Sequence, residues 1–398
     1  MIKENLAGFF LECYKRVPAV KKMFDDVEIR PQEINNVQDL SRLPVTPKSE
    51  LVNMQKDSSS LGGFLSGGLS DLKRLFMSPG PIYDPEGNKE DYWRWSPALK
   101  AAGFGPQDVV QNTFSYHFTP AGMMFDAGLR ELGCTVVPTG VGNNEQQVQV
   151  MHDLNVTGFV GIPSYLRALI DKAREMGFSF PDNFKLEKAF FTAEMLPNSL
   201  RKEFSSMGID AYQGYGTADL GCIAFECSYK EGMHLGDGVI VEIVNPETGM
   251  QVEAGEVGEL VVTLLDITYP LIRFATGDLS MIIPEACSCD NSSLRIKGVL
   301  GRVGDAVKVR GLFVHGSQIK EAVNPFPDVL NYQAVVSRND YKDELTLQVE
   351  IDPHETLDPE KIATKLKEST RLNCDVKIVP IGSIAEDDVI IKDIRTWD

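Results

Sequence analysis

The chain has 398 residues, of which 43% are hydrophobic and 24% charged, a balance ordinary for a globular protein and too apolar for a disordered one. That length is enough for one large core and a second, smaller unit. The net charge of −18 excludes a nonspecific nucleic-acid binder, because such proteins need clustered lysine and arginine.

Hydropathy and cysteine content limit the cellular compartments that the sequence fits. No window of the sequence approaches the roughly 20 apolar residues that a membrane-spanning helix needs, and the first residues lack an apolar signal core. We therefore expect a cytoplasmic protein without a membrane partner. Seven cysteines without a secretory signal argue against a disulfide framework and leave metal binding or simple burial.

The first 200 residues read as a helical lead-in followed by alternating helices and strands. Residues 1–56 are polar and helical in pattern, with turn signals at 36–40 and 44–48. Alternation from about residue 93 favours a parallel sheet covered by helices. We expect strands at 108–112, 134–138, 158–162 and 188–191, and helices at 123–132, 146–154 and 165–176.

Beyond residue 239 the pattern changes to antiparallel strands, at 239–244 and 258–263 around a turn at 246–249. The last hundred residues run strand, helix, strand, strand, helix, strand, an order that suggests a small ferredoxin-like unit. The sequence therefore predicts an α/β fold: a large N-terminal domain of helix-covered, mostly parallel sheets with a small antiparallel β region, followed by a small α+β domain. The elements expected there are a helix at 317–323, strands at 332–337 and 344–351, a helix at 359–372 and a strand at 375–380.

Three short blocks carry the strongest signal. They are Tyr215-Gly-Thr-Ala-Asp219, then Thr276-Gly-Asp278, then Gly301-Arg302 followed by Asp305, Lys308, Arg310 and Gly311. Any one block alone fits a surface turn, but their order and spacing together do not. They resemble the nucleotide-binding core of AMP-forming adenylating enzymes, in the phenylacetate-CoA ligase-like branch of the acyl-CoA synthetases. The resemblance covers almost the whole chain and implies an AMP-binding domain at 1–301 and a small mobile C-terminal domain at 302–398.

The resemblance assigns nucleotide contacts to particular residues. It implies that the aromatic ring of Tyr215 packs on adenine, that Asp278 accepts both ribose hydroxyls, and that Arg302 contacts ribose or phosphate. A carboxylate suits a vicinal diol because its two oxygens accept two hydrogen bonds in one plane. For Lys308 and Arg310 the alternative to a phosphate contact is a solvated strand face. The nucleotide-binding residues implied are Ala193, Glu194, Tyr215, Gly216, Thr217, Asp278, Arg302, Lys308 and Arg310.

Asp219 stands where the resembling family has a glutamate that helps to hold Mg²⁺. Aspartate keeps the hard oxygen ligand but is one methylene shorter. We therefore expect Asp219 to serve a catalytic Mg²⁺ with altered reach.

The phosphate-binding stretch departs from the family. Relatives have a Ser/Thr/Gly-rich loop whose amides and hydroxyls wrap the phosphates, whereas residues 76–88 offer only Ser78 and Gly80 as similar donors. Asp84 and Glu86 add negative charge where a triphosphate would lie, so we expect weak polyphosphate affinity. Three residues of this stretch also lack a backbone amide hydrogen, namely Pro79, Pro81 and Pro85.

The C-terminal end departs as well. The family presents a Gly-Lys pair there, and an ungapped register from Asp393-Ile-Arg395 places Glu386 and Asp387 on it. Preorganised positive charge at a reacting phosphate lowers a barrier by several kcal/mol, so this reversal predicts very slow adenylation. Lys392 is the nearest substitute, but it lies in a strand-like segment, where exposed lysines are common.

Four residues form a separate metal signal: Cys227, His234, Cys287 and Cys289. Ligands of these types from two loops fit tetrahedral Zn²⁺, although the spacing is looser than in common zinc fingers and cysteines are often merely buried. Some phenylacetate-CoA ligase-like proteins have cysteines and a histidine in these places. A closed four-ligand site would be structural.

Residues 114–122 resemble the family's acyl-pocket segment. An aromatic wall from Tyr116, Phe118 and Tyr165 would suit an aryl acid, while the alternative is ordinary core packing. His117 would contact a carboxylate or serve as a core or helix-capping histidine.

Three functions follow from these patterns. The first is an AMP-forming ligase that activates an aryl or small carboxylic acid with ATP and transfers it to CoA, with adenylation weak or lost. The second is a non-catalytic homologue that binds AMP or CoA as a sensor or partner subunit. The third is nucleotidyl transfer of the coenzyme F390 synthetase-like kind. Dimerisation is common in the resembling family, so a homodimer is also to be expected.

Overall fold

The computed structural model describes residues 5–57, 61–78, 81–303, 306–310, 312–339, 342–352, 355, 357–385 and 389–395. The chain divides into two compact units. The first unit comprises Met1–Glu256, Leu260–Thr276 and Met281–Val299, and the second comprises Val257–Glu259, Gly277–Ser280 and Leu300–Asp398.

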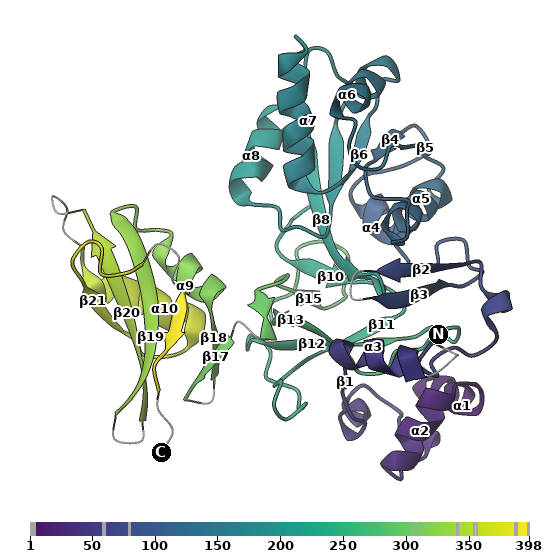
Figure 1. Ribbon diagram of the computed structural model, residues 1–398, viewed down its shortest axis with the longest axis horizontal. Coiled ribbons are helices and arrows are strands. Elements are labelled where there is room, and N and C mark those ends of the chain that lie inside the picture. Colours follow the sequence, from purple (N-terminus) through teal and green to yellow (C-terminus); the bar gives the residue numbers. More distant parts are fainter. Residues whose placement is uncertain are drawn as a thin grey trace. The chain divides into compact units, whose positions relative to one another are not determined.

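A mixed sheet dominates the first unit (Figure 1). Among the described residues its order is β14-β15-β10-β9-β8-β7-β6-β4-β5. The half from β8 to β5 is parallel, and the half from β9 to β14 continues it in antiparallel pairs. The strands are β4 (Val109–Asn112), β5 (Thr135–Pro138), β6 (Gly158–Gly161), β7 (Lys188–Phe191), β8 (Asp210–Thr217), β9 (Gly221–Glu226), β10 (Met233–Leu235), β14 (Ile282–Ile283) and β15 (Arg295–Ile296).

Helices cover both faces of the parallel half. Val160 and Phe190 pack on one face against α4 (Ser96–Ala101) and α5 (Ala121–Glu131). Their strand neighbours Phe159 and Phe191 point to the opposite face, because side chains alternate along a strand. There they meet α6 (Asn144–Asp153), α7 (Pro163–Glu175) and α8 (Asn198–Ser206). The predicted α/β architecture is confirmed.

A second sheet has the order β1-β13-β12-β11, and β16 pairs with β13. The strands of this second sheet are β1 (Thr46–Pro47), β11 (Val239–Val244), β12 (Gly258–Leu264), β13 (Phe274–Ser280) and β16 (Gly301–Arg302). The N-terminal part also contains one antiparallel hairpin, β2–β3, which occupies the stretch that departs from the family's phosphate loop. Its elements are α1 (Leu6–Arg16), α2 (Pro18–Asp26), α3 (Lys48–Asp57), β2 (Arg74–Ser78) and β3 (Ile82–Glu86), with 3-10 turns at Pro31–Glu33, Gln38–Arg42 and Leu69–Asp71.

The second unit has its own sheet, ordered β21-β20-β19-β22. The predicted succession of strand, helix, strand, strand, helix, strand is present along the chain. Within the described part, its first strand, β18, pairs with β17 in a hairpin, and the four-stranded sheet instead gains β22, parallel to β19. The elements are β17 (Ala306–Val309), β18 (Leu312–His315), α9 (Gly316–Val323), β19 (Val329–Asn339), β20 (Lys342–Ile351), α10 (Pro359–Thr370), β21 (Asp375–Ile378) and β22 (Ile391–Asp393).

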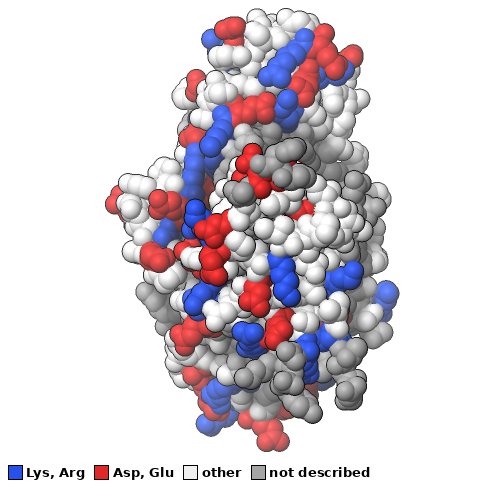
Figure 2. Space-filling model, turned by 90° about the vertical axis from the view of Figure 1, so that its left-hand side faces the viewer, with Lys and Arg blue, Asp and Glu red and all other residues white. Residues whose placement is uncertain are grey.

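Two surface properties bear on partners. Over the ranges that the structure describes, none of the helices is both long and apolar enough to cross a bilayer. Acidic and basic side chains lie interspersed on the face drawn in Figure 2.

Candidate active site and metal centre

The predicted site residues of the first unit lie in loops that follow the parallel strands. Parallel strands β4, β6, β7 and β8 all end at the same edge of the sheet. In open α/β sheets, ligands bind outside this carboxyl edge. The structure therefore places at one edge residues that follow four separate strands: Tyr116, His117 and Phe118 after β4, Tyr165 in the first turn of α7 after β6, Ala193 and Glu194 after β7, and Asp219 after β8.

The end of β8 is built by close packing. A Cβ atom on Gly216 would lie 2.3 Å from the carbonyl oxygen of Gly221 and 2.6 Å from the Trp95 ring, so only glycine fits this position. The hydroxyl of Thr217 accepts a hydrogen bond from the amide of Leu220 at 3.2 Å. This bond closes the turn that presents Asp219. Tyr215 is 8% exposed and belongs to the hydrophobic core of this region, so only a small part of this residue is open to the predicted contact with adenine.

The loop after β7 is strained and tied to its neighbour. Ala193 has a φ of 66°, in the left-handed region that non-glycine residues rarely occupy. Glu194 accepts a hydrogen bond from the hydroxyl of Ser164, at the start of α7, at 2.6 Å. Strain of this kind gathers at ligand-binding loops, and the place of Ala193 and Glu194 beside a base stays a prediction.

Asp219 is held by a lysine. Its side chain is 0% exposed, and its Oδ2 atom accepts from the ammonium of Lys48 at 2.5 Å. Asp84 on β3 lies in the same cluster and is 1% exposed. Burial and the charge of Asp219 raise the pKa of Asp84 to about 8, against the opposing effect of Ser78 and Lys48.

Lys48 competes with a metal for Asp219. One oxygen of Asp219 accepts from this ammonium, which comes from α3, remote in sequence, and the pKa of the neighbouring Asp84 is raised. The role of Asp219 as a Mg²⁺ ligand stays a prediction.

Lys48 was not among the predicted site residues, although the sequence contains a signal for it. It is the first residue of α3, and a cation is unfavourable at a helix N-terminus because the helix dipole is positive there. A lysine at that position indicates a carboxylate partner nearby.

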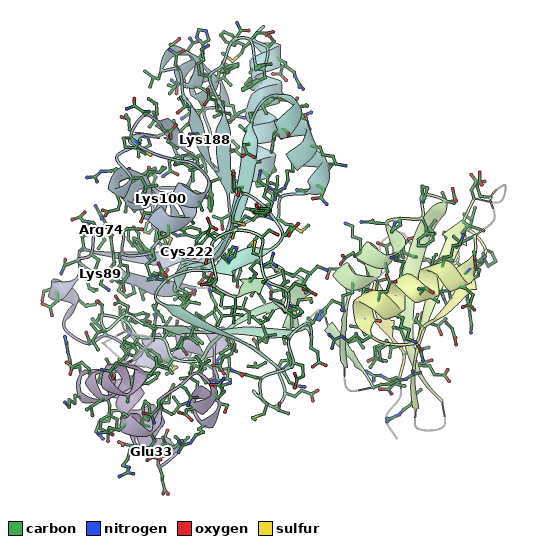
Figure 3. The ribbon with its side chains drawn as sticks, turned by 180° about the vertical axis from the view of Figure 1, so that it is seen from behind. Glu33, Arg74, Lys89, Lys100, Lys188 and Cys222 are labelled. Carbon is green, nitrogen blue, oxygen red and sulfur yellow. The ribbon has the colours of Figure 1, made fainter. Side chains whose placement is uncertain are left out.

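The hairpin β2–β3 pairs one of the two acids that the sequence predicted to add negative charge there. Glu86 is buried, and both its carboxylate oxygens accept from Arg74, at 2.9 and 3.0 Å, so its charge is neutralised within the hairpin. Figure 3 labels Arg74 on this hairpin. Ser78 and Asp84 are also buried. Two residues of the stretch, Pro79 and Gly80, lie outside the described residues.

The aromatic residues predicted to form the acyl pocket differ in their exposure and bonding. Phe118 is 76% exposed with a φ of 59°, and His117 is exposed too. The hydroxyl of Tyr116 accepts from Asn112 at 2.8 Å, and burial together with Asp126 raises its pKa. The hydroxyl of Tyr165 is bonded to Gly142, Asn144 and Gln147, so it holds the loop before α6 and offers a ligand only its ring.

In the second unit, two predicted ribose contacts are paired with each other. Asp278 on β13 lies opposite Arg302 on β16, and Oδ1 of Asp278 accepts from Nε of Arg302 at 2.8 Å. The amide of Gly277 donates to Glu259 at 3.2 Å. Burial, and then the charge of Asp278, raise the pKa of Glu259.

The structure describes only some of the other residues of the second unit that are predicted to contact the ligand. Nε of Arg310, which lies between β17 and β18, donates to the carbonyl of Asp343 at 2.6 Å, and its phosphate contact stays a prediction. Lys392 lies in β22, exposed and opposite Val335, so the predicted strand is present. Several predicted positions lie outside the described residues: the side chain of Lys308, and Asp305, Gly311, Glu386 and Asp387.

The four predicted metal ligands lie together in the first unit. The ligand atoms of Cys227, His234, Cys287 and Cys289 are all within 4.8 Å of one another. Nδ1 of His234 lies 3.2 Å from the carbonyl oxygen of Ser293, which accepts from it and directs Nε2 at the thiols. The amide of Cys289, followed by His234 and the neighbouring thiols, lowers the pKa of Cys287 to about 6. Thiolates are the metal-binding form, so the donor set fits a closed structural Zn²⁺ site.

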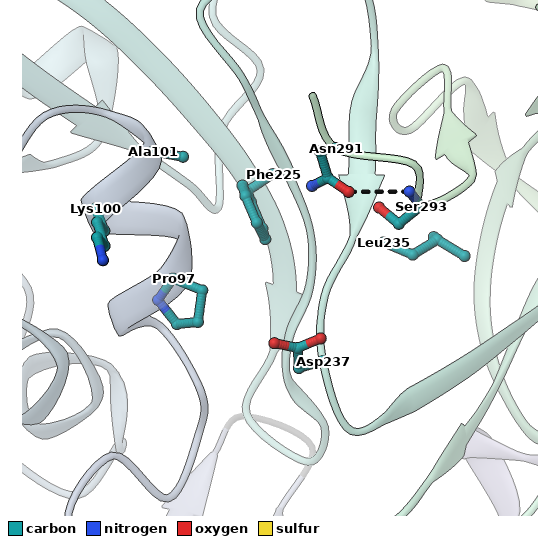
Figure 4. A pocket seen from close by; sticks show the side chains of 8 residues that line it. All are labelled: Pro97, Lys100, Ala101, Phe225, Leu235, Asp237, Asn291 and Ser293. Carbon is teal, nitrogen blue, oxygen red and sulfur yellow. Dashed lines mark hydrogen bonds between the residues drawn. The ribbon is translucent and has the colours of Figure 1, made fainter. Parts of the chain in front are cut away.

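A cavity of about 440 Å³ lies beside the metal ligands (Figure 4). Lys100 on α4 and Phe225 on β9 line one side, and Asn291 and Ser293 line the other. The side-chain oxygen of Asn291 accepts from the amide of Ser293 at 2.9 Å. These segments are far apart in sequence, so no local pattern could have indicated the cavity.

Known proteins match this chain along most of its length. Residues 91–264 match the model of the AMP-binding enzyme family, and residues 311–396 match that of the AMP-binding enzyme C-terminal domain. A phenylacetate-coenzyme A ligase from Thermus thermophilus is 29% identical over 414 residues, covering 96% of this chain and 92% of that protein. One from Escherichia coli is 28% identical over 403 residues, covering 96% and 90%.

The fold is shared with a solved ligase. The crystal structure of an open conformation of 2-hydroxyisobutyryl-CoA ligase superposes with a TM-score of 0.84 at 22% identity, covering 97% of this chain and 89% of that one. The two family models, the near-full-length relatives and this fold agree with the three sequence blocks and with the loops gathered at the carboxyl edge. The chain belongs to the AMP-binding enzymes and is of the phenylacetate-CoA ligase-like kind.

Proposed function

We propose that the protein is a phenylacetate-CoA ligase-like enzyme that binds an acyl adenylate and transfers its acyl group to CoA, and that forms this adenylate from ATP only slowly. The observation that carries the proposal is the gathering of four predicted site loops at the carboxyl edge of the parallel strands. An adenylate needs a base contact and a phosphate contact, and the candidates for these are Ala193, in the loop after β7, and Thr217, the last residue of β8.

Slow adenylation is supported by the phosphate end of the site. ATP brings a triphosphate that usually travels with Mg²⁺, yet the carboxylate of Asp219 is already paired with Lys48. Among its described residues the hairpin β2–β3 offers no lysine or arginine side chain except Arg74, which is paired with the buried Glu86. An adenylate has a single phosphate, so it needs less positive charge than ATP.

The acid is an aryl or small carboxylic acid. The segment after β4 supports this class, because it carries two aromatic residues, Tyr116 and Phe118, with the exposed His117 between them. An aromatic wall favours a flat acyl group, and a histidine offers a donor to a carboxylate. The names of the relatives, phenylacetate-coenzyme A ligases, point to the same class of acid and to CoA as acceptor.

Two half-reactions, measured separately, test the proposal. ATP–pyrophosphate exchange with a panel of aryl and short-chain acids measures adenylation, and thioester formation from pre-made phenylacetyl adenylate and CoA measures transfer. We expect exchange near background and transfer clearly above the rate without protein. Fast exchange would contradict slow adenylation, and absence of transfer with every adenylate would contradict the ligase.

A non-catalytic homologue is the second candidate, favoured by the same Lys48–Asp219 pair. It predicts that AMP or CoA raises the melting temperature while both half-reactions stay at background. The transfer assay separates the two candidates, because only an enzyme accelerates it.

A further inference from the structure

The position of Lys48 is electrostatically unfavourable for a cation, and its carboxylate partner offsets this cost. It begins α3, where the helix dipole repels a cation. Its ammonium nevertheless reaches the fully buried side chain of Asp219 at 2.5 Å, while 31% of the lysine side chain remains exposed. The lysine therefore connects a buried carboxylate with the solvent side of the carboxyl edge.

A second carboxyl group, that of the buried Asp84, lies in the same cluster, where Ser78 hydrogen-bonds to it. Among the described residues, Oδ1 of Asp219 is a buried oxygen without a hydrogen-bond partner. Buried polar atoms without partners are rare in folded proteins. Asp219 and Lys48 both act electrostatically on Asp84, so the two carboxyl groups share the influence of one ammonium, which contacts Asp219.

The donor set is the kind that a divalent cation selects. Two carboxyl groups and a hydroxyl are hard oxygen ligands of the sort that bind Mg²⁺ or Mn²⁺. In this chain the positive charge comes from a side chain instead. A divalent ion at the same place would have to displace an ammonium from Asp219 and remove the proton that burial keeps on Asp84.

We propose that the ammonium of Lys48 is the resident cation of the Asp84–Asp219 carboxyl pair, that it takes the place of a divalent metal there, and that a bound adenylate meets it with its phosphate. The part about phosphate rests on the proposed function, whereas the replacement of the metal does not. Asp219 lies two residues beyond Thr217 at the end of β8, and the exposed part of Lys48 is available to an anion at that end. The site therefore binds adenylates without a metal.

Binding of Mn²⁺ alone, followed by electron paramagnetic resonance, tests the replacement directly. Wild-type protein should leave Mn²⁺ free at this site, and K48M should bind one ion at least about tenfold more tightly, because removal of the ammonium leaves uncompensated carboxyl oxygens. The double variant K48M/D84N should lose that ion again. Wild-type protein that binds Mn²⁺ as tightly as K48M would overturn the proposal, as would a folded K48M that binds none.

Lys89 offers a matched control. Its ammonium lies 2.7 Å from the buried carboxylate of Asp266, but Asp266 is a single acid that also accepts from the Thr268 amide at 2.8 Å. K89M therefore removes a lysine from a buried aspartate without exposing a pair of carboxyl groups. The K89M variant should bind Mn²⁺ no more tightly than the wild type does.

Binding of AMP tests the phosphate contact and keeps the two proposals apart. Wild-type affinity for AMP should be the same in excess chelator and in Mg²⁺, K48R should retain most of it, and K48M should lose at least about tenfold in chelator and regain part of it with Mn²⁺. A wild-type affinity that falls in chelator overturns the inference even if K48M does not fold. If AMP fails to bind at all, the proposed function fails, while the Mn²⁺ titration still decides the metal replacement.

Discussion

The carboxyl group of Asp84 is neutral at a pH where most aspartates are charged. Burial is the larger cause and the neighbouring charge of Asp219 the second, and together they raise its pKa to about 8. Leaving this acid protonated avoids two adjacent buried negative charges with only one lysine between them. The charge state of a single residue therefore makes the whole cluster neutral.

This shift predicts how stability changes with pH. The folded state keeps a proton on Asp84 that the unfolded chain releases above the ordinary pKa of 3.8, so stability should fall as pH rises from there towards 8, by at most about 1.4 kcal/mol per pH unit. D84N removes this dependence. Urea unfolding at pH 5.5, 6.5 and 7.5 should show that the free energy of unfolding of D84N rises relative to that of the wild type as the pH rises. The exposed-site control D182N should show the same pH dependence as the wild type. Equal slopes for D84N and wild type would contradict the assignment.

Gly216 shows how tightly one position at the carboxyl edge is determined. A methyl group there would collide with the Gly221 carbonyl and with Trp95. G216A should cost about 1–3 kcal/mol of stability through overpacking. Gly105 is the control, since an added Cβ meets nothing within 4 Å, and G105A should stay within about 0.5 kcal/mol of the wild type. Chemical denaturation of both variants compares them, and a neutral G216A would refute the packing argument.

At the scale of elements, the loop between β14 and β15 depends on the metal ligands. It carries Cys287 and Cys289, and its strands connect to the rest of the sheet through β10, where His234 lies. The strands β14 and β15 are short, so backbone pairing holds this loop weakly. A tetrahedral ion would join the loop to the ends of β9 and β10.

We expect one zinc ion per chain in protein purified without added metal. C287S should abolish it, and both this variant and chelator should lower the melting temperature by several degrees, because the ion binds the folded state. C134A changes a buried cysteine elsewhere in the same unit and should keep its zinc. Metal analysis by mass spectrometry measures the content. Full thermal stability in chelator would show that the loop does not need an ion.

At the scale of the whole molecule, the two units have separate cores. The second unit encloses its own cluster of buried residues, among them Val314, Ile319, Ala334, Leu347 and Leu366. A unit of about 100 residues with one core is large enough to fold alone. The longest segment of this unit begins at Leu300, and the boundary between residues 301 and 302 stays a prediction.

A fragment of residues 302–398, the predicted C-terminal domain, should therefore fold without the rest of the chain. We expect cooperative thermal unfolding and dispersed amide resonances, and L347A should destabilise the fragment by about 2–5 kcal/mol because its side chain is fully buried. An exposed-site change such as K365A should have little effect. A fragment with collapsed resonances and no cooperative transition would show that the boundary is wrong.

Much of the fold was predictable because its signals are local. Alternation of helix and strand predicted the parallel sheet, and the ranges 188–191 and 239–244 agree with β7 and β11. The pairing of β22 with β19 was not predictable in the same way. A strand of three residues carries little periodic signal, and its partner lies more than fifty residues away.

The sequence by itself determined the family, the two-part α/β architecture and which side chains follow the ends of the parallel strands, because motifs and periodicity lie within short windows. Only the tertiary structure decided what each charged side chain meets. Lys48 and Asp219 are separated by 171 positions, and Asp84 comes from a third segment. Burial and the pairing of charges depend on contacts between distant segments, so the pairing of Lys48 with Asp219 could be seen only in the folded chain.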